Sequence, residues 1–308
     1  MPAIARLLGF SNTSSNSQIL TSSDFKIGLV PELPEVERLR RSLARAMTGA
    51  RFERVRLNRP DLRRPFPAGF ARRIRGQLVR ALARRGKYLL VELSSGETLV
   101  MHLGMSGWFR IEKTQRARQR DRDADLDNRH DHVVFSMSSG NTVTFNDPRR
   151  FGVMDLVKAE PLAGHSALGR LGPEPLSRRF DAKALAARVA GRRISLKAAL
   201  LDQHVVAGIG NIYASEALHL AGLSPFRLAS TIATAAGAPR SGSERLVRAI
   251  KSVLRRAIAL KNGDDYRASR FRVYDHEGEP CTTSGCRGTI ARAWQNCRST
   301  FYCPVCQG

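Results

Sequence analysis

The heptapeptide Pro31-Glu32-Leu33-Pro34-Glu35-Val36-Glu37 opens a segment with a clear helical pattern, which we predict to run from Pro34 to about Met47. Glu35 and Glu37 fall in its first turn, where the positive end of the helix dipole favours carboxylates. Apolar residues then recur every three or four positions, as one buried face of a helix requires, at Val36, Leu39, Leu43 and Met47. This start therefore predicts an amphipathic helix with a carboxylate-rich beginning.

The composition of the chain indicates an anion-rich partner. The 308 residues include 51 Lys and Arg against 27 Asp and Glu, which gives a formal net charge of +24 and a pI of about 11.2. Nucleic acid fits this charge best, because neutralised phosphates release their counterions. Hydrophobic residues make up 42%, which is enough for packed cores and excludes a fully disordered chain. No apolar run reaches the roughly 18 residues of a membrane span, so we expect no membrane partner.

Three kinds of segment follow one another along the chain. Short apolar or alternating runs, typical of antiparallel strands, occupy Lys87–Leu93, Thr98–Leu103, His132–Met137 and Thr142–Phe145. Helical periodicity follows over Ala182–Ala190, Leu196–Asp202, Asn211–Ala221 and Glu244–Leu260. The last of these has an apolar face at Leu246, Ile250, Val253, Leu254 and Ala257. The nearly pure charge of residues 115–130 predicts a solvated loop between two strands.

These segments predict an α+β multidomain fold. We assign residues 30–160 to an N-terminal β domain, residues 173–270 to a helical domain and residues 271–308 to a cysteine module. Residues 1–29 are rich in Ser and Thr and have only Arg6, Asp24 and Lys26 as charged side chains. A signal peptide or transit peptide fits them poorly, so we expect a disordered or non-native extension.

All five cysteines lie near the end of the chain. Cys281 and Cys286 are separated by four residues, sixteen residues follow, and Cys303 and Cys306 are separated by two. Four thiolates in two close pairs match a tetrahedral structural zinc site with no open coordination position. The alternative is a set of buried or disulfide-linked cysteines, which a chain without an export signal does not favour. Cys297 breaks the pairing and is either a free thiol or a competing ligand.

A glycine turn at Ala207-Gly208-Ile209-Gly210-Asn211 joins two of the predicted helices. It lacks both the preceding strand and the third glycine of a dinucleotide fingerprint. Two interpretations remain open from the residues alone. Asn211 and the glycine N–H groups can bind a phosphate at a helix N-terminus, or Asn211 can simply cap the helix.

Together with the start of the helix, several further motifs resemble formamidopyrimidine-DNA glycosylases, which repair oxidised purines. These motifs are Gly86-Lys87-Tyr88-Leu89-Leu90, His102-Leu103-Gly104-Met105-Ser106-Gly107, Asp147-Pro148-Arg149-Arg150-Phe151-Gly152, Leu171-Gly172-Pro173-Glu174-Pro175-Leu176, Gly208 to Glu216 and the cysteine module. They keep the order of that family from about Pro31 to Gln307. The resemblance implies a β-sandwich with an N-terminal helix, a helix-two-turns-helix domain, a zinc finger with one structural Zn²⁺, and DNA in the basic cleft between the two main domains.

The resemblance also implies catalytic roles for four residues. In the family, the secondary amine of an N-terminal proline attacks C1′ of the damaged nucleotide, and Pro31 occupies that position. Glu32 would be the acid–base group, Lys87 a proton donor in β-elimination, and Arg298 a phosphate clamp that assists δ-elimination. Glu35 would hold the amine and the turn in place. The alternative for both glutamates is ordinary first-turn helix charge, and for Lys87 and Arg298 it is a surface cation.

DNA contacts follow from the same resemblance. His130, Arg149, Arg192, Lys197 and Asn211 align with residues that contact the DNA backbone. Met105, Arg149 and Phe151 match side chains that fill the gap left by a flipped base, which is needed because the target base must leave the stack. Core packing is the alternative for Met105 and Phe151.

Three departures from the family pattern bear on function. Pro31 is internal, and an internal proline has no free amine, so we expect the working chain to begin at Val30, read as an alternative start and followed by removal of that residue. Processing of a 30-residue leader is the other route to a free Pro31. The first cysteine pair is two residues longer than the usual spacing. The segment Lys261–Phe271 is shorter and more acidic than the family loop over the everted base, which leaves lesion preference open.

We therefore predict a bifunctional glycosylase and abasic-site lyase for oxidised purines in double-stranded DNA, acting as a monomer in the bacterial cytoplasm near the nucleoid. One rival is a damage-binding protein of the same fold with a blocked amine. Another is an RNA-binding or ribosome-associated zinc ribbon, which explains the charge and the cysteines but not the motifs around Pro31, Lys87 and Arg149.

Overall fold

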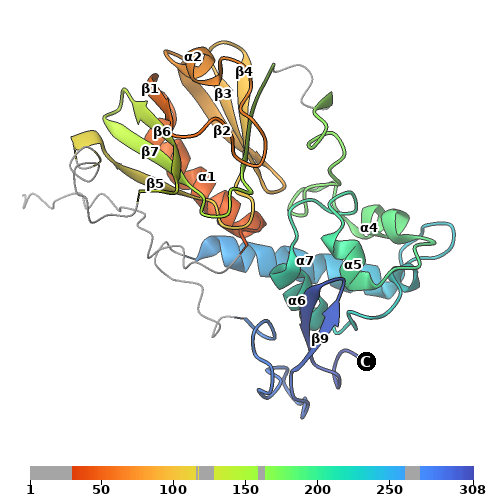
Figure 1. Ribbon diagram of the computed structural model, residues 1–308. Coiled ribbons are helices and arrows are strands. Elements are labelled where there is room, and N and C mark those ends of the chain that lie inside the picture. Colours follow the sequence, from red (N-terminus) through yellow and green to blue (C-terminus); the bar gives the residue numbers. More distant parts are fainter. Residues whose placement is uncertain (1–29, 116, 118–127, 159–163, 261–270) are drawn as a thin grey trace, which may run out of the picture.

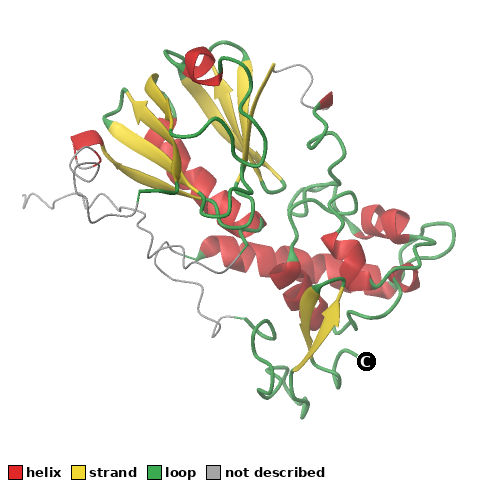
Figure 2. Cartoon of the chain, in the orientation of Figure 1, coloured by secondary structure: helices red, strands yellow, loops and turns green. Residues whose placement is uncertain are grey.

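The structure is a computed structural model that describes residues 30–115, 117, 128–158, 164–260 and 271–308. The predicted extension at residues 1–29 lies outside the described residues, as do most of the charged 115–130 segment and residues 261–270. A lobe built of strands and a lobe built of helices make up most of the described chain, and a small hairpin lies against the helical lobe (Figure 1). Figure 2 shows that most strands lie in one lobe and most helices in the other, with helices α1 and α2 packed against the sheets.

Helix α1 (Leu33–Met47) joins the two lobes. The predicted apolar face at Val36, Leu39, Leu43 and Met47 is at most 1% exposed and packs into the core of the strand lobe. Leu33, one turn earlier, belongs to the core of the helical lobe instead. The beginning of α1 is therefore fixed at the interface between the lobes, which is where Pro31 and Glu32 lie.

The strand lobe is a sandwich of two four-stranded antiparallel sheets. One sheet has the order β1 (Phe52–Leu57), β6 (Asp131–Met137), β7 (Asn141–Asn146), β5 (Trp108–Lys113). The other has the order β2 (Val79–Arg85), β3 (Tyr88–Leu93), β4 (Glu97–His102), β8 (Val153–Lys158). The short helix α2 (Phe70–Ile74) packs on β1. Alternate side chains of the strands fill the core, as the period of two predicts.

The helical lobe contains α4 (Ala182–Val189), α5 (Leu196–Leu201), α6 (Asn211–Leu220), the 3₁₀ turn η3 (Ala229–Ile232) and α7 (Ser241–Ala259). Asp181 caps α4 by accepting the Ala184 N–H at 2.8 Å, and Ser195 caps α5 by accepting the Ala198 N–H at 3.2 Å. The residue before α6 is Gly210, which has no side chain to cap that helix. The first N–H groups of α6 are therefore left for another part of the chain.

The C-terminal module is a hairpin of β9 (Ala291–Gln295) and β10 (Arg298–Tyr302) with cysteine loops around it. Its two turn residues, Asn296 and Cys297, both have positive φ, at 48° and 58°. Two such residues between paired strands form the type of turn whose twist matches a tight hairpin. Arg298 follows this turn directly and so lies at the tip of the hairpin.

The predicted α+β architecture is confirmed, and the predicted strands and helices lie within a few residues of those observed. The charged 115–130 segment does connect two strands, β5 and β6, but these strands are not neighbours. Both pair with β7 instead, which lies between them in the sheet. No helix among the described residues is long and apolar enough to cross a membrane.

Candidate active site and metal centre

Glu32 caps helix α6 from the other lobe. Its carboxylate accepts the Gly210 N–H at 2.8 Å and the Ile212 N–H at 3.0 Å, and the side chain is only 2% exposed. A Cβ on Gly210 would lie 2.3 Å from the Glu32 carboxyl carbon, so only glycine lets the carboxylate approach. Glu32 is also the N-cap residue of α1, so this carboxylate lies at the start of its own helix and binds the orphan donors of a second one.

Glu35 fixes the turn that contains Glu32. It accepts the Glu32 N–H at 3.0 Å and the phenol hydroxyl of Tyr213 at 2.7 Å. Tyr213 comes from α6 and is 4% exposed. The sequence analysis did not identify this tyrosine, and only its place in the segment Gly208 to Glu216 could have suggested it.

Pro31 is buried beside this turn. The Leu33 N–H donates to the Gly208 carbonyl at 3.1 Å, which holds the chain just after Pro31 against the glycine turn. Gly208 has φ of 85°, and a Cβ there would lie 2.7 Å from the Leu33 side chain. The two glycines thus allow the two lobes to pack closely, in addition to starting a helix. Neither phosphate binding nor helix capping, the two functions considered from the sequence, includes this packing role.

Lys87 follows Gly86 in the turn between β2 and β3 and faces the same junction. Burial lowers the pKa of its ammonium group, and Arg298 lowers it further, while Glu32 acts to raise it. Burial likewise raises the pKa of the Glu32 carboxyl, although Lys87 and the Ile212 and Gly210 N–H groups oppose that shift. The net shifts move both groups toward their neutral forms, a pattern common at reacting centres.

The turn that carries Lys87 is anchored to the segment between the lobes by Glu174. This carboxylate accepts the Gly86 N–H at 2.5 Å, Arg84 at 2.8 Å and Arg85 at 3.2 Å. Arg84 also donates to Glu37 of α1 at 3.3 Å. The position of Lys87 is therefore fixed by contacts of its turn with two other parts of the chain.

The C-terminal hairpin is bound to α5 and α6 through Ser299, the residue that follows Arg298. Asn211 at the start of α6 donates to the Ser299 carbonyl at 3.0 Å. Lys197 donates from Nζ to the same carbonyl and to the Thr300 hydroxyl, both at 2.8 Å. Burial, with Arg298, lowers the pKa of Lys197 to about 8.

Lys197 has a structural role in the DNA-free protein. The side chain is 1% exposed and its ammonium group holds the hairpin against α5. A DNA phosphate could be reached only after the hairpin moves, so the phosphate contact of Lys197 stays a prediction.

Two adjacent loops present the predicted gap-filling residues. Met105 and Phe151 are each 39% exposed, and the Arg149 guanidinium lies 4.8 Å from the centre of the Phe151 ring. Such exposure contradicts the core-packing alternative for Met105 and Phe151. The loops are locked together by Asp147, whose carboxylate accepts the Ser106 hydroxyl at 2.6 Å and the Gly152 N–H at 2.7 Å.

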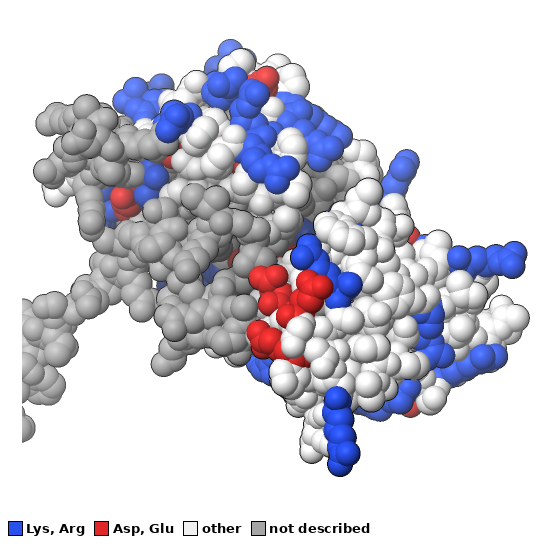
Figure 3. Space-filling view, turned by 60° about the horizontal axis from the view of Figure 1, so that its bottom comes forward, with Lys and Arg blue, Asp and Glu red and all other residues white. Residues whose placement is uncertain are grey.

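The remaining predicted DNA contacts lie apart from the junction. His130 is half-buried next to the Asp147 loop, where its carbonyl accepts the Asp147 N–H at 3.0 Å. Arg192 donates to Asp202 at 2.7 Å in the helical lobe. Lys and Arg side chains are spread over the face in Figure 3, where Asp and Glu form one cluster and a few scattered patches.

His102 also lies at the site, although the sequence suggested no role for it beyond being the first residue of the motif His102 to Gly107. It accepts the Gly104 N–H at Nδ1 at 3.0 Å, and its ring packs 4.7 Å from that of Tyr88. Burial lowers its pKa to about 4, with Lys87 and Arg63 adding to the effect. A neutral imidazole therefore lies beside Lys87.

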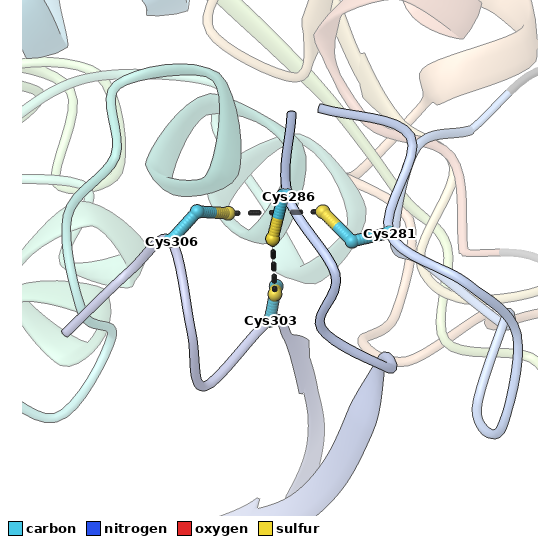
Figure 4. Close-up of side chains that lie close together, drawn as sticks. All are labelled: Cys281, Cys286, Cys303 and Cys306. Carbon is cyan, nitrogen blue, oxygen red and sulfur yellow. Dashed lines mark hydrogen bonds between the residues drawn. The ribbon is translucent and has the colours of Figure 1, made fainter. Parts of the chain in front are cut away.

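The four predicted metal ligands meet at one point. The sulfur atoms of Cys281, Cys286, Cys303 and Cys306 all lie within 4.8 Å of one another (Figure 4). Two pairs are separated by 3.7 Å and 3.6 Å, close to the roughly 3.8 Å edge of a tetrahedron with zinc–sulfur bonds of about 2.3 Å. Cys297 is exposed at the hairpin turn and outside this group, so it is not a competing ligand.

A β-sandwich, a helical domain and a four-cysteine hairpin meet at a buried carboxylate and a half-buried lysine, with exposed apolar loops nearby. The class of protein with this combination of domains is the DNA-repair glycosylases, as comparison with known proteins shows. The profile of the formamidopyrimidine-DNA glycosylase N-terminal domain matches residues 30–154, and that of the H2TH domain of the same enzyme matches residues 171–267.

Known formamidopyrimidine-DNA glycosylases are similar to this chain over most of its length. The formamidopyrimidine-DNA glycosylase of Azorhizobium caulinodans is 54% identical over 295 residues, which cover 90% of this chain and 100% of that protein. A Lactococcus lactis formamidopyrimidine-DNA glycosylase bound to DNA with an abasic site is 29% identical, with TM-score 0.77 and 90% and 99% coverage. MutM in complex with DNA containing carbocyclic 8-oxo-G is 30% identical, with TM-score 0.77 and 90% and 100% coverage.

The chain belongs to the formamidopyrimidine-DNA glycosylase family. It is thereby an enzyme of DNA repair by base excision.

Proposed function

We propose that the protein excises oxidised purines, 8-oxoguanine and formamidopyrimidines, from double-stranded DNA and then cleaves the abasic site by β,δ-elimination through a Schiff base on Pro31. The observation that carries the proposal is the junction itself. Pro31 adjoins the buried Glu32 carboxylate, whose pKa is raised, and the half-buried Lys87, whose pKa is lowered, interacts electrostatically with that carboxylate. The lesions in the DNA of related complexes support the substrate class.

The proposed first step is attack by a neutral Pro31 amine on C1′ of the lesion. The glycosidic bond breaks, and its electron pair leaves with the base. Loss of the amine proton and opening of the C1′–O4′ bond then give an iminium, with the proton for O4′ delivered by Glu32. Burial raises the pKa of this carboxyl, which brings it closer to the range in which a carboxylic acid serves as a general acid.

The proposed elimination steps use the iminium as an electron sink. Transfer of a C2′ proton to water expels the 3′ phosphate, and transfer of a C4′ proton to water expels the 5′ phosphate. Lys87 in its ammonium form is the proposed donor of a proton to the leaving phosphate, and Arg298 at the hairpin tip is the proposed phosphate clamp. Met105, Arg149 and Phe151 would enter the gap that the everted base leaves.

The chemistry requires a free amine at Pro31. In a chain that continues before Pro31, its nitrogen is part of an amide and cannot form an iminium. We therefore propose that the catalytic form begins at Pro31. The family profile starts its match at residue 30, which supports this. A chain that keeps residues before Pro31 has a blocked amine. For such a chain the second candidate function, a damage-binding protein without catalysis, is favoured.

The four-cysteine cluster is the proposed site of one structural Zn²⁺. Its sulfur separations fit tetrahedral zinc, and four protein ligands leave no open position for catalysis. Bound there, the ion would hold the hairpin loops together and keep Arg298 at the junction. We further propose that the protein acts as a monomer on DNA in the bacterial cytoplasm, near the nucleoid.

Borohydride trapping tests the proposal. The chain beginning at Pro31 is mixed with duplex DNA that carries 8-oxoguanine opposite cytosine, and sodium borohydride reduces any imine. The matched control differs only by Val30 left in front of Pro31, and a Lys87→Ala variant asks whether that lysine is the trapped amine. We expect a covalent band from the Pro31 chain and from Lys87→Ala, and none from the control.

A band from the control would show that another amine attacks the sugar and would overturn the role of Pro31. Tight lesion binding without any band, even on abasic DNA, would favour the damage-binding protein instead.

A further inference from the structure

The C-terminal end of α6 reaches the cysteine cluster through a histidine. His219 is 3% exposed, and its Nε2 lies 3.3 Å from the Sγ of Cys281 and 3.3 Å from the Thr283 hydroxyl. It belongs to the helical lobe, whereas both partners belong to the C-terminal module. It is therefore a polar link between the two parts of the chain.

The hydrogen-bond pattern of the ring fixes which nitrogen carries the proton. Nδ1 of His219 is buried and has no partner among the described residues. A proton on Nδ1 would be an orphaned donor, whereas a proton on Nε2 points at Cys281 and Thr283. The neutral ring with N–H at Nε2 is thus the form that suits this place, and it is a donor toward the sulfur.

The sulfur needs such a donor. Four thiolates around one Zn²⁺ leave a net negative charge, which N–H groups aimed at the sulfurs stabilise. Cys281 receives one backbone N–H, from Thr283 at 3.5 Å, and Cys286 receives one, from Gly288 at 3.4 Å. The loop between Cys281 and Cys286 is two residues longer than the usual spacing, and a side chain from another lobe supplies Cys281 with a second donor.

We propose that His219 is a positioning residue of the metal centre, donating its Nε2–H to the Cys281 thiolate and so fastening the C-terminal module to α6. Helix α6 then links the metal centre to the reacting groups, because its other end is capped by Glu32. Between them, Glu216 accepts the N–H groups of Arg272, Val273 and Tyr274 at 2.9–3.0 Å. The inference rests on the proposed zinc ion and not on the proposed Schiff-base chemistry.

Zinc release tests the inference without any measurement of repair. The holoprotein is mixed with a chromogenic zinc chelator, and the rate of colour formation is followed. His219→Phe keeps the ring volume but removes the donor, and we expect release to be about 10- to 100-fold faster. His219→Gln places an N–H donor near the position of Nε2, and we expect release within about threefold of the unaltered protein. His204→Phe is the matched control, since His204 is 61% exposed and contacts Asp202 instead.

Equal release rates for His219→Phe and the unaltered protein would overturn the role of His219. A holoprotein that contains no zinc would instead show that the proposed ion is wrong, so the two failures are distinguishable. If His219→Phe does not fold, the unaltered protein loaded with ¹¹³Cd gives the answer by NMR. A scalar coupling between the metal and the Hε2 proton of His219 is expected across the N–H···S bond. An Hε2 proton that is visible but uncoupled would overturn the proposal.

Discussion

Glu32 and Phe151 belong to the same predicted site but lie in opposite environments. Glu32 is 2% exposed and is held by backbone N–H groups of α6, whereas Phe151 is 39% exposed at the tip of a loop. Burial shifts the proton affinity of Glu32, which acid–base chemistry needs. Exposure leaves Phe151 free to enter a stack of bases, which recognition needs. The proposed acid–base role thus requires a buried side chain and the proposed recognition role an exposed one, and the two side chains lie in different elements of the chain.

Removal of the Glu32 carboxyl is expected to have the largest effect. In Glu32→Gln the amide cannot donate a proton as a carboxylic acid does, and its NH₂ group would face the Gly210 or Ile212 N–H. We expect single-turnover excision of 8-oxoguanine to fall by about 10³-fold in the chain that begins at Pro31. Glu92→Gln, at an exposed position of β3, is the matched control. An excision rate within threefold of that of the unaltered enzyme would mean that Glu32 only caps the helix and takes no part in the chemistry.

Truncation of the exposed loops separates recognition from chemistry. In Met105→Ala with Phe151→Ala, nothing apolar fills the gap of the flipped base, and we expect a loss of about 2 kcal/mol, or ~30-fold, in excision of a paired lesion. Trapping on a preformed abasic site, where no base has to be displaced, should change by less than about threefold. Leu228→Ala is the control, because Leu228 is 46% exposed in the helical lobe. Equal losses on both substrates would mean that the loops serve the chemical step.

The contrast also explains which features the sequence could predict. Periodicity is a local property, so α1, the strands and α7 were predicted from residues close together in the chain. The capping of α6 by Glu32 joins residues 178 positions apart, and no local pattern encodes it. The burial of Lys197 follows in the same way from its contact with Ser299 and Thr300, about a hundred residues later. The cysteine spacing was informative because metal geometry restricts such spacings.

The half-buried His102 predicts a pH effect on stability. The pKa of His102 is about 4 in the folded protein and near 6.5 when unfolded. Between these values only the unfolded chain binds the proton, so stability falls as the pH decreases from about 7 to about 5. In His102→Asn, which can still accept the Gly104 N–H, we expect the free energy of unfolding to fall by about 1–2 kcal/mol less over that range. Urea unfolding at both pH values measures the difference, and an equal fall in the two proteins would refute the neutral imidazole.

The smallest expected effect is a change in the salt dependence of DNA binding, which distinguishes the exposed Arg149 from the buried Lys197. Arg149 is exposed beside Phe151, whereas Lys197 is 1% exposed and bound to the hairpin. A phosphate contact contributes about one unit to the slope of log affinity against log salt concentration. We expect Arg149→Ala to lower that slope by about one unit and Lys197→Met to leave it unchanged. Binding titrations on abasic-site DNA at several salt concentrations measure both slopes. A lower slope for Lys197→Met would mean that the hairpin moves when DNA binds and frees the lysine for a phosphate, as the sequence predicts.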